Sequence, residues 1–213
     1  CLVADMIVGK SGGLLDFKFY PAVMRSHLRL TYTLAFEALF EGKPAARNSI
    51  GALFPALEPL VELYRVLLKA RHRRGALDFE STEPTYDFDE AGRVRGMSLY
   101  ARNDAHKLIE ECMILANIAS ASLVEKAKEP ALYRIHESPG EERLTGFRDF
   151  LGELGLNLAG GLEPSPTDYA NLMKQIGERQ DKELIQTMLL RSMKQAVYNA
   201  DNCGHFGLAL KRY

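Results

Sequence analysis

The sequence predicts an α+β fold in which a mixed, largely antiparallel sheet packs against several long helices. Two β-rich segments, residues 2–8 and 14–24, flank the KSGG of residues 10–13, which favours a hairpin because glycine adopts the positive φ of tight turns. Residues 54–74 and 102–127 repeat apolar side chains at helical spacing. With 46% hydrophobic and 26% charged residues, the 213-residue chain has the composition of a globular domain with a sizeable core.

Composition argues against several classes of protein. The formal net charge of −1 gives no overall basic field that would attract nucleic acid or a membrane. The sequence contains no signal peptide and no apolar run near the roughly 20 residues of a membrane helix. The three cysteines, Cys1, Cys112 and Cys203, are too widely spaced for a CxxC metal motif and fit a reducing compartment. We therefore expect a cytoplasmic protein without a membrane partner.

The segment after the first hairpin predicts one short helix and one loop. Thr31 or Thr33 can cap a helix that ends near Gly42, because a hydroxyl oxygen accepts hydrogen bonds from the first N–H groups of a helix. Residues 43–53 contain proline, asparagine and glycine, and this composition predicts a loop.

The first long helix, residues 54–74, ends in a cluster of basic residues. Gly75 is its expected stop, since glycine adopts the left-handed conformation that follows many helices. Cations at a helix C-terminus complement the helix dipole, and contacts with phosphate groups are the alternative. The cluster consists of Arg65, Lys69, Arg71, Arg73 and Arg74.

Residues 77–79 are predicted to be extended, and residues 85–88 and 94–100 to form a second hairpin. The DFDE of residues 87–90, at its turn, offers carboxylates to a metal ion. Hairpin tips are commonly acidic because they are solvated and form turns, so we expect a turn there.

The second long helix, residues 102–127, has two polar faces where one would suffice. Asn103 or Asp104 can cap it, and Pro130 limits it because the proline ring cannot continue a helix. At about 100° per residue, one broad arc is apolar and contains Ala105, Leu108, Ile109, Cys112, Leu115, Ala116 and Ala119. An ordinary solvated face contains Asp104, Lys107, Glu111 and Glu125. Beside the apolar arc runs a third line of residues, Arg102, His106, Glu110, Asn117 and Ser120.

This third line has two interpretations. Burying such polar groups without partners costs a few kcal/mol each, so they should meet partners or line a cleft. The alternative is that they bond to nearby backbone and helix caps.

The last third of the chain predicts further helices and strands without a clear domain boundary. Residues 132–136 should be a strand, and residues 141–154 a helix stopped by Gly155. Thr167 is expected to cap a helix after the loop at 158–166. The remaining predictions are a helix at 182–193 and extended segments at 195–198 and 205–210.

The sequence contains no motif for nucleophilic catalysis and no glycine-rich phosphate loop. His136 and His205 lie at predicted strand ends, where a histidine is either a structural hydrogen-bonding group or a catalyst. Tyr32 follows Arg29, and Phe79 follows the basic end of the first long helix. Rings beside cations suit single-stranded nucleic acid, since bases stack on rings and cations contact phosphates.

Several long blocks of sequence carry a resemblance to a known family. They are DFKFYPAVMRSHLRLTY (16–32), RGALDFES (74–81), RNDAHKLIEECMILAN (102–117), EKAKEPALYRIH (125–136), QTMLLRSMKQAVY (186–198) and GHFGLAL (204–210). In these blocks the chain resembles the catalytic RNB domain of the ribonuclease II/R family. Residues 1–213 would form the central and C-terminal part of one such domain, and we expect it to be truncated at both ends.

The resemblance implies a processive, Mg²⁺-dependent exoribonuclease that hydrolyses single-stranded RNA from its 3′ end and releases nucleoside 5′-monophosphates. By motif, Tyr32 matches a tyrosine near the scissile end, Phe79 an aromatic that clamps terminal bases, and Glu110 a glutamate that contacts the terminal sugar. A carboxylate that accepts from the 2′-hydroxyl would select RNA over DNA. The candidate RNA contacts also include Arg102, His106, Asn117 and His205. We expect a monomer.

Two departures from the family pattern affect catalysis. The aspartate motif GxDxxDxDDA, which holds the family's metal ions, does not occur in the 213 residues. The signature HFGL-x4-Y-xx-FTSPIRRY is present only to its first tyrosine, Tyr213. We therefore expect no metal site and no catalysis from these residues alone. The alternatives to an enzyme are an RNA-binding module without chemistry and a purely structural core fragment.

Overall fold

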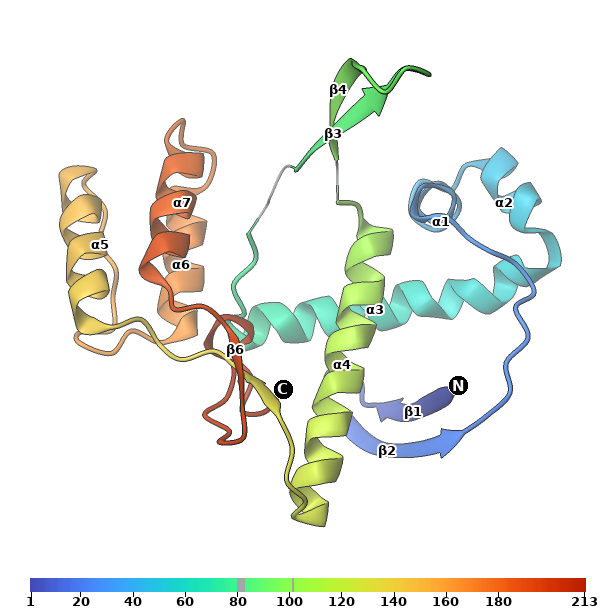
Figure 1. The fold of residues 1–213 in the computed structure, drawn as a ribbon, viewed down its shortest axis with the longest axis horizontal. Coiled ribbons are helices and arrows are strands. Elements are labelled where there is room, and N and C mark those ends of the chain that lie inside the picture. Colours follow the sequence, from blue (N-terminus) through green and yellow to red (C-terminus); the bar gives the residue numbers. More distant parts are fainter. Residues whose placement is uncertain (80–82, 101) are drawn as a thin grey trace.

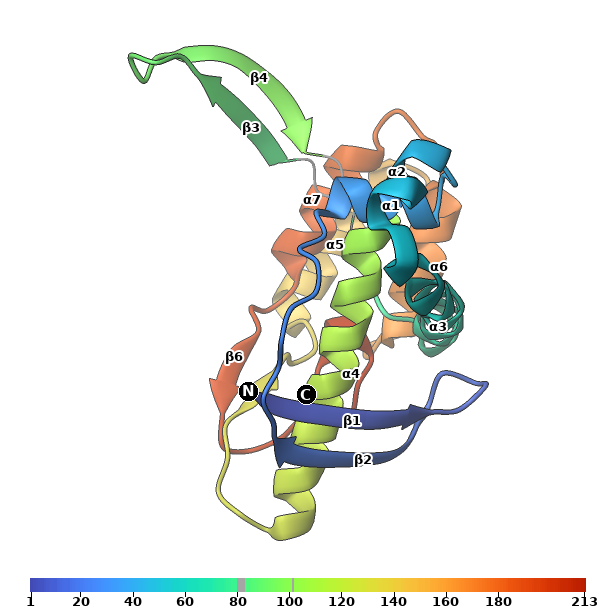
Figure 2. The same ribbon diagram turned by 90° about the vertical axis from the view of Figure 1, so that its right-hand side faces the viewer.

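The helix α4 (Asp104–Ala127) forms the centre of the structure (Figure 1). The computed structural model describes residues 1–79, 83–100 and 102–213. α3 (Phe54–Arg74) crosses α4, and α1 (Tyr32–Leu39) contacts both helices. The hairpin of β1 (Leu2–Val8) and β2 (Leu14–Pro21) contacts α4 toward its C-terminal end, whereas α1 lies near its N-terminal end (Figures 1 and 2).

The α+β class and both predicted hairpins are confirmed. Within the described residues, the strands form three separate two-stranded antiparallel sheets, not one continuous sheet. β1 pairs with β2, β3 (Glu83–Phe88) with β4 (Val94–Tyr100), and β5 (Tyr133–Ile135) with β6 (Val197–Asn199). The β3–β4 hairpin stands away from the helices (Figure 2).

Local capping signals explain where the two long helices begin and end. The Asn103 side chain accepts hydrogen bonds from the N–H groups of Ala105 and His106, while the His106 ring accepts from the Asn103 N–H, so α4 begins with a reciprocal capping box. Gly75 ends α3 at φ +76°. A Cβ there would lie 2.6 Å from the Thr167 hydroxyl, so both backbone conformation and space require glycine.

The segment at 43–53 corrects a predicted loop. It forms α2 (Pro44–Ile50) and the short 3₁₀ helix η1 (Gly51–Leu53). Proline is favourable in the first turn of a helix, and Ala46 and Ile50 bury their side chains against Ala38 of α1. The expected cap of α1 is confirmed, since the Thr31 hydroxyl accepts from the Leu34 N–H.

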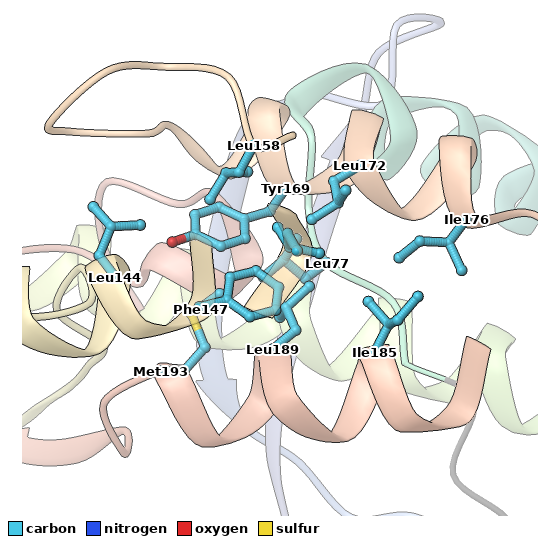
Figure 3. Close-up of a cluster of buried hydrophobic side chains, with 11 residues drawn as sticks. Leu77, Leu144, Phe147, Leu158, Tyr169, Leu172, Ile176, Ile185, Leu189 and Met193 are labelled. Carbon is cyan, nitrogen blue, oxygen red and sulfur yellow. The ribbon is translucent and has the colours of Figure 1, made fainter. Parts of the chain in front are cut away.

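Three helices in the second half enclose a separate apolar cluster (Figure 3). They are α5 (Glu141–Glu153), α6 (Pro166–Ile176) and α7 (Lys182–Ser192). Phe147, Tyr169 and Leu189 are among its buried members. The predicted cap of α6 at Thr167 is wrong, because the Ser165 hydroxyl accepts from the Asp168 N–H and the Asp168 carboxylate accepts from the Ser165 N–H.

Two predicted extended segments are not strands. Residues 77–79 have no strand pairing, although the Leu77 N–H donates to the Gly207 carbonyl. Residues 205–210 fold into single bridges around the 3₁₀ helix η2 (Phe206–Leu208). None of the helices in the described ranges combines the length and hydrophobicity that crossing a bilayer requires.

Candidate functional site

The first turns of α1 and α4 bring two aromatic rings together. Tyr32 opens α1, and His106 lies in the first turn of α4. Their rings stack with centroids 3.9 Å apart and an interplanar angle of 24°. Burial lowers the pKa of His106, and the charge of Arg102 acts in the same direction. Tyr32 remains 45% exposed, so one part of the stack is open to solvent.

One turn further along α4, two arginines fix the carboxylate of Glu110. Arg71 of α3 donates to Oε1 at 3.1 Å, and Arg102 donates to Oε2 at 2.5 Å. Arg102 also donates to Asp78 at 3.1 Å. The Glu110 side chain is 36% exposed. Since an ionised carboxylate offers about four acceptor positions, Glu110 keeps acceptor capacity for a ligand while its orientation is set by both cations.

Glu111 corrects the helical-wheel assignment. It was placed on the solvated face of its helix, but its side chain is only 4% exposed and accepts from Arg71 Nη1 at 2.6 Å. Arg71 is only 5% exposed, so its charge interacts with carboxylates inside the molecule. Arg71 lies in the last turn of α3, where its charge complements the helix dipole as predicted, and it also forms a buried ion pair between α3 and α4.

A sequence signal for this pair existed. Arg71 continues the buried stripe of α3 that contains Tyr64 and Leu67, at i+7 and i+4. Glu111 continues the buried stripe of α4 with Leu108 and Leu115, at i+3 and i−4. Opposite charges within the apolar stripes of two helices predict a buried pair, because each would be too costly to bury alone.

Phe79 lies at the edge of this site. Its ring packs against the apolar cluster of α5, α6 and α7 and is partly buried. The preceding residue, Asp78, receives the hydrogen bond from Arg102. Phe79 is thus one residue away from the ion pairs that fix Glu110, and its predicted role as a base clamp stays a prediction.

The third line of α4 divides into two parts. At the N-terminal end, Arg102 and Glu110 form ion pairs, and His106 bonds to the helix cap. Toward the C-terminal end, the Asn117 amide donates to the Tyr213 hydroxyl at 3.0 Å, and Ser120 donates to the Ala116 carbonyl. Both interpretations of the line therefore apply: some members bond to local backbone, and Asn117 also lines a cavity of about 610 Å³.

His205 does not join Tyr32 and Glu110. Its Nδ1 accepts from the Leu208 N–H at 3.2 Å, and its ring packs edge-on against His136 and Tyr213. Burial, aided by the nearby His136, lowers the pKa of His205 to about 4. The His136 Nδ1 likewise accepts from the Gly207 N–H. These contacts favour the interpretation of both histidines as structural hydrogen-bonding groups.

The described residues do not fit a magnesium site. Among residues 1–79, 83–100 and 102–213, no cluster of three His, Cys, Asp or Glu side chains is positioned to hold a metal ion. The carboxylates of Asp78, Glu110 and Glu111 lie close to one another through shared arginines, and those arginines already neutralise them. At the β3–β4 turn, Asp89 accepts from the Ala91 and Arg93 N–H groups, which is a turn-forming role.

Comparison with known proteins decides the family. The RNB domain model matches residues 1–213. The chain belongs to the RNB family. It is 68% identical over 213 residues to ribonuclease R of Vibrio cholerae and 54% identical to ribonuclease R of Escherichia coli. It covers 26% of each of these proteins, so this RNB chain spans about a quarter of their length.

Solved structures share the fold of this chain. Ribonuclease R of Mycoplasma genitalium, in complex with ribose-methylated single-stranded RNA, matches all of this chain and 33% of its own with a TM-score of 0.88. At 22% identity this likeness shows the fold. The predicted resemblance to the ribonuclease II/R family is confirmed by the family model and the ribonuclease R relatives.

Proposed function

We propose that this RNB chain belongs to an exoribonuclease that degrades single-stranded RNA processively from the 3′ end and releases nucleoside 5′-monophosphates. It acts as a cytoplasmic monomer on RNA and not on DNA. The ribonuclease R names of its relatives support the exoribonuclease class. As part of the same proposal, residues 1–213 form the central and C-terminal part of a single catalytic domain.

The single observation that carries the proposal is the doubly held carboxylate of Glu110 beside the Tyr32–His106 stack. Arg71 and Arg102 orient the carboxylate, and the exposed ring of Tyr32 lies close to the same end of α4. A fixed acceptor can take a hydrogen bond from a 2′-hydroxyl, which DNA lacks. A ring beside it can stack on the terminal base.

The test compares binding of two fluorescein-labelled oligomers, r(A)₈ and d(A)₈, by anisotropy at one salt concentration. The wild-type chain should prefer RNA, and Glu110→Gln should remove most of this preference while binding of d(A)₈ stays unchanged. Glu90→Gln, an exposed carboxylate at the hairpin tip, is the matched control and should bind like wild type. Equal affinity of the wild type for both oligomers would contradict the proposed role of Glu110.

We also propose that these 213 residues do not catalyse hydrolysis by themselves, because the described residues hold no metal cluster. Incubation with poly(A) and Mg²⁺ should release no nucleotides, and robust release would overturn this part of the proposal. The second candidate function is RNA binding without chemistry, and the fixed carboxylate of Glu110 beside the exposed Tyr32 ring favours it. If the folded chain has no affinity for RNA, the purely structural alternative holds instead.

A further inference from the structure

Asp78 lies where segments that are far apart in the sequence meet. It follows the end of α3, in the stretch of residues 77–79 that pairs with no strand. Arg71 Nη2 donates to the Leu77 carbonyl at 3.2 Å, and the Leu77 N–H donates to the Gly207 carbonyl at 2.8 Å. These two bonds hold the backbone immediately before Asp78, so its carboxylate extends from a fixed point.

The Asp78 carboxylate faces both arginines that hold Glu110. Its Oδ1 accepts from Arg102 Nη1 at 3.1 Å and lies 3.7 Å from Arg71 Nη2. On the other side, Glu110 accepts from Arg102 Nη2 and from Arg71 Nη1. The four side chains therefore form a closed ring of alternating charge, in which each guanidinium lies between two carboxylates.

Within this ring, Arg102 depends most on Asp78 for its orientation. The Arg102 side chain is 28% exposed, whereas Arg71 is buried and is also held by Glu111. Two carboxylates bound to different nitrogens fix the plane of a guanidinium, because its N–H groups form a rigid fork. With Glu110 as its only partner, Arg102 would be able to turn about that ion pair toward solvent. Asp78 therefore sets the direction from which Arg102 holds Glu110.

Asp78 also keeps these cations from acting as phosphate ligands. The carboxylates of Asp78, Glu110 and Glu111 outnumber the guanidiniums of Arg71 and Arg102 by one. A phosphate gains little from cations that are already neutralised. Removal of the Asp78 charge would leave the group neutral and would free Arg102 for a phosphate, which RNA and DNA share. The Asp78 carboxylate thus favours a sugar contact at Glu110 over a phosphate contact at Arg102.

The alternative is that Asp78 only ties residues 77–79 to α4. Its side chain is 32% exposed, and an ion pair at that exposure contributes little to stability. A purely structural role predicts that loss of the Asp78 charge changes RNA binding and DNA binding by the same factor. A role through Glu110 predicts that the two change by different factors, because DNA lacks the 2′-hydroxyl.

We propose that Asp78 is a positioning residue for the discrimination of RNA from DNA. Through Arg102, it holds the Glu110 carboxylate in the orientation that accepts a 2′-hydroxyl, and it makes no contact with the nucleic acid itself. This inference rests on the proposed function, since both require Glu110 to contact the sugar. It adds a residue outside α4 on which the sugar preference depends.

The test extends the anisotropy comparison of r(A)₈ and d(A)₈ to Asp78→Asn, which keeps the size of the side chain and removes its charge. The ratio of RNA affinity to DNA affinity should fall about fivefold, within the range of coupling between members of one ion-pair network. The affinity for d(A)₈ should not fall. Asp149→Asn changes an exposed aspartate on α5, is the matched control and should bind like wild type.

A double variant shows whether Asp78 acts through Glu110. Adding Asp78→Asn to Glu110→Gln should lower the affinity ratio no further than Glu110→Gln alone, because two residues that act on one contact are not additive. A further fivefold fall in the double variant would show that Asp78 acts independently of Glu110 and would overturn the inference.

Arg102→Lys keeps the proposal testable if circular dichroism shows that Asp78→Asn does not fold. Lysine keeps the charge but offers a single nitrogen, so the fork between Asp78 and Glu110 is lost and the affinity ratio should again fall. An unchanged ratio in the folded variants, or an equal loss for both oligomers, would overturn the inference and leave the proposed function standing as long as Glu110→Gln loses the RNA preference. If Glu110→Gln keeps that preference, both fail.

Discussion

Replacing Glu111 by alanine should destabilise the chain strongly, because it removes the closest partner of a buried cation. Arg71 and Glu111 are each about 95% buried, and their charged groups lie 2.6 Å apart. The remaining partners of Arg71, Glu110 at 3.1 Å and Asp78 at 3.7 Å, are about one third exposed and compensate only in part. Removing one member of a buried pair costs about 3–5 kcal/mol.

The assay is thermal unfolding followed by far-ultraviolet circular dichroism. For a chain of this size, each kcal/mol lowers Tm by about 2–4 °C, so Glu111→Ala should lower Tm by roughly 6–20 °C. Glu110→Ala is the matched control one residue away. Its partly exposed carboxylate should contribute only about 1 kcal/mol, and so its Tm should fall by a few degrees.

A double variant separates the effect of the two charges on stability from the effect of the volume that the two side chains fill. Arg71→Met with Glu111→Leu removes both charges and keeps apolar volume, so most of the lost stability should return. The reasoning fails if Glu111→Ala lies within 1 kcal/mol of wild type, because Glu111 would then not compensate a buried charge. It also fails if Glu110→Ala is the more destabilising of the two.

Three further predictions concern stability. Burial lowers the pKa of His205 from 6.5 to about 4 on folding, so between pH 6.5 and 4 only the unfolded chain takes up this proton and the free energy of unfolding should decrease as the pH falls. The full shift corresponds to about 3 kcal/mol, which solvent screening reduces to about 1–2 kcal/mol. Urea titrations at several pH values should give a flatter pH profile for His205→Asn than for wild type. Asn103→Ala should lose about 1 kcal/mol through the α4 cap, and Asn103→Asp should not; equal urea midpoints for the two variants would contradict this. Lys128→Gly should raise Tm, because Lys128 has φ +56° at the end of α4 and glycine relieves about 0.5–1 kcal/mol of backbone strain there. The control Lys126→Gly lies within the helix and should lower Tm.

Local signals made most helices predictable from sequence. Asn103 caps α4, Thr31 caps α1 and Gly75 stops α3, and each acts on backbone groups within a few residues of itself. The predicted cap at Thr167 failed because Ser165, two residues earlier, has the reciprocal partner Asp168. The loop predicted at 43–53 failed because turn-forming residues were given more weight than the apolar contacts of Ala46 and Ile50 with α1.

The candidate site was only partly predictable, because its geometry depends on contacts between distant segments. Glu110 was identified by motif, and the structure adds the two arginines that hold it. Glu111 was misplaced because a helical wheel describes one helix at a time, while its partner Arg71 is 40 residues earlier in the chain. The stacking of Tyr32 on His106 likewise requires α1 and α4 to meet, and no spacing within either helix specifies that.

The uninterrupted course of α4 limits how the sequence can change by insertion or deletion. One residue added between Glu110 and Leu115 would turn every following side chain by about 100°, moving Asn117 away from Tyr213 and Leu115 out of the core. Seven added residues would restore the face but shift Asn117 by about 10 Å along the axis. In functional sequences of this type, length variation should therefore occur in segments such as the β3–β4 turn, which projects into solvent, and not within this helix.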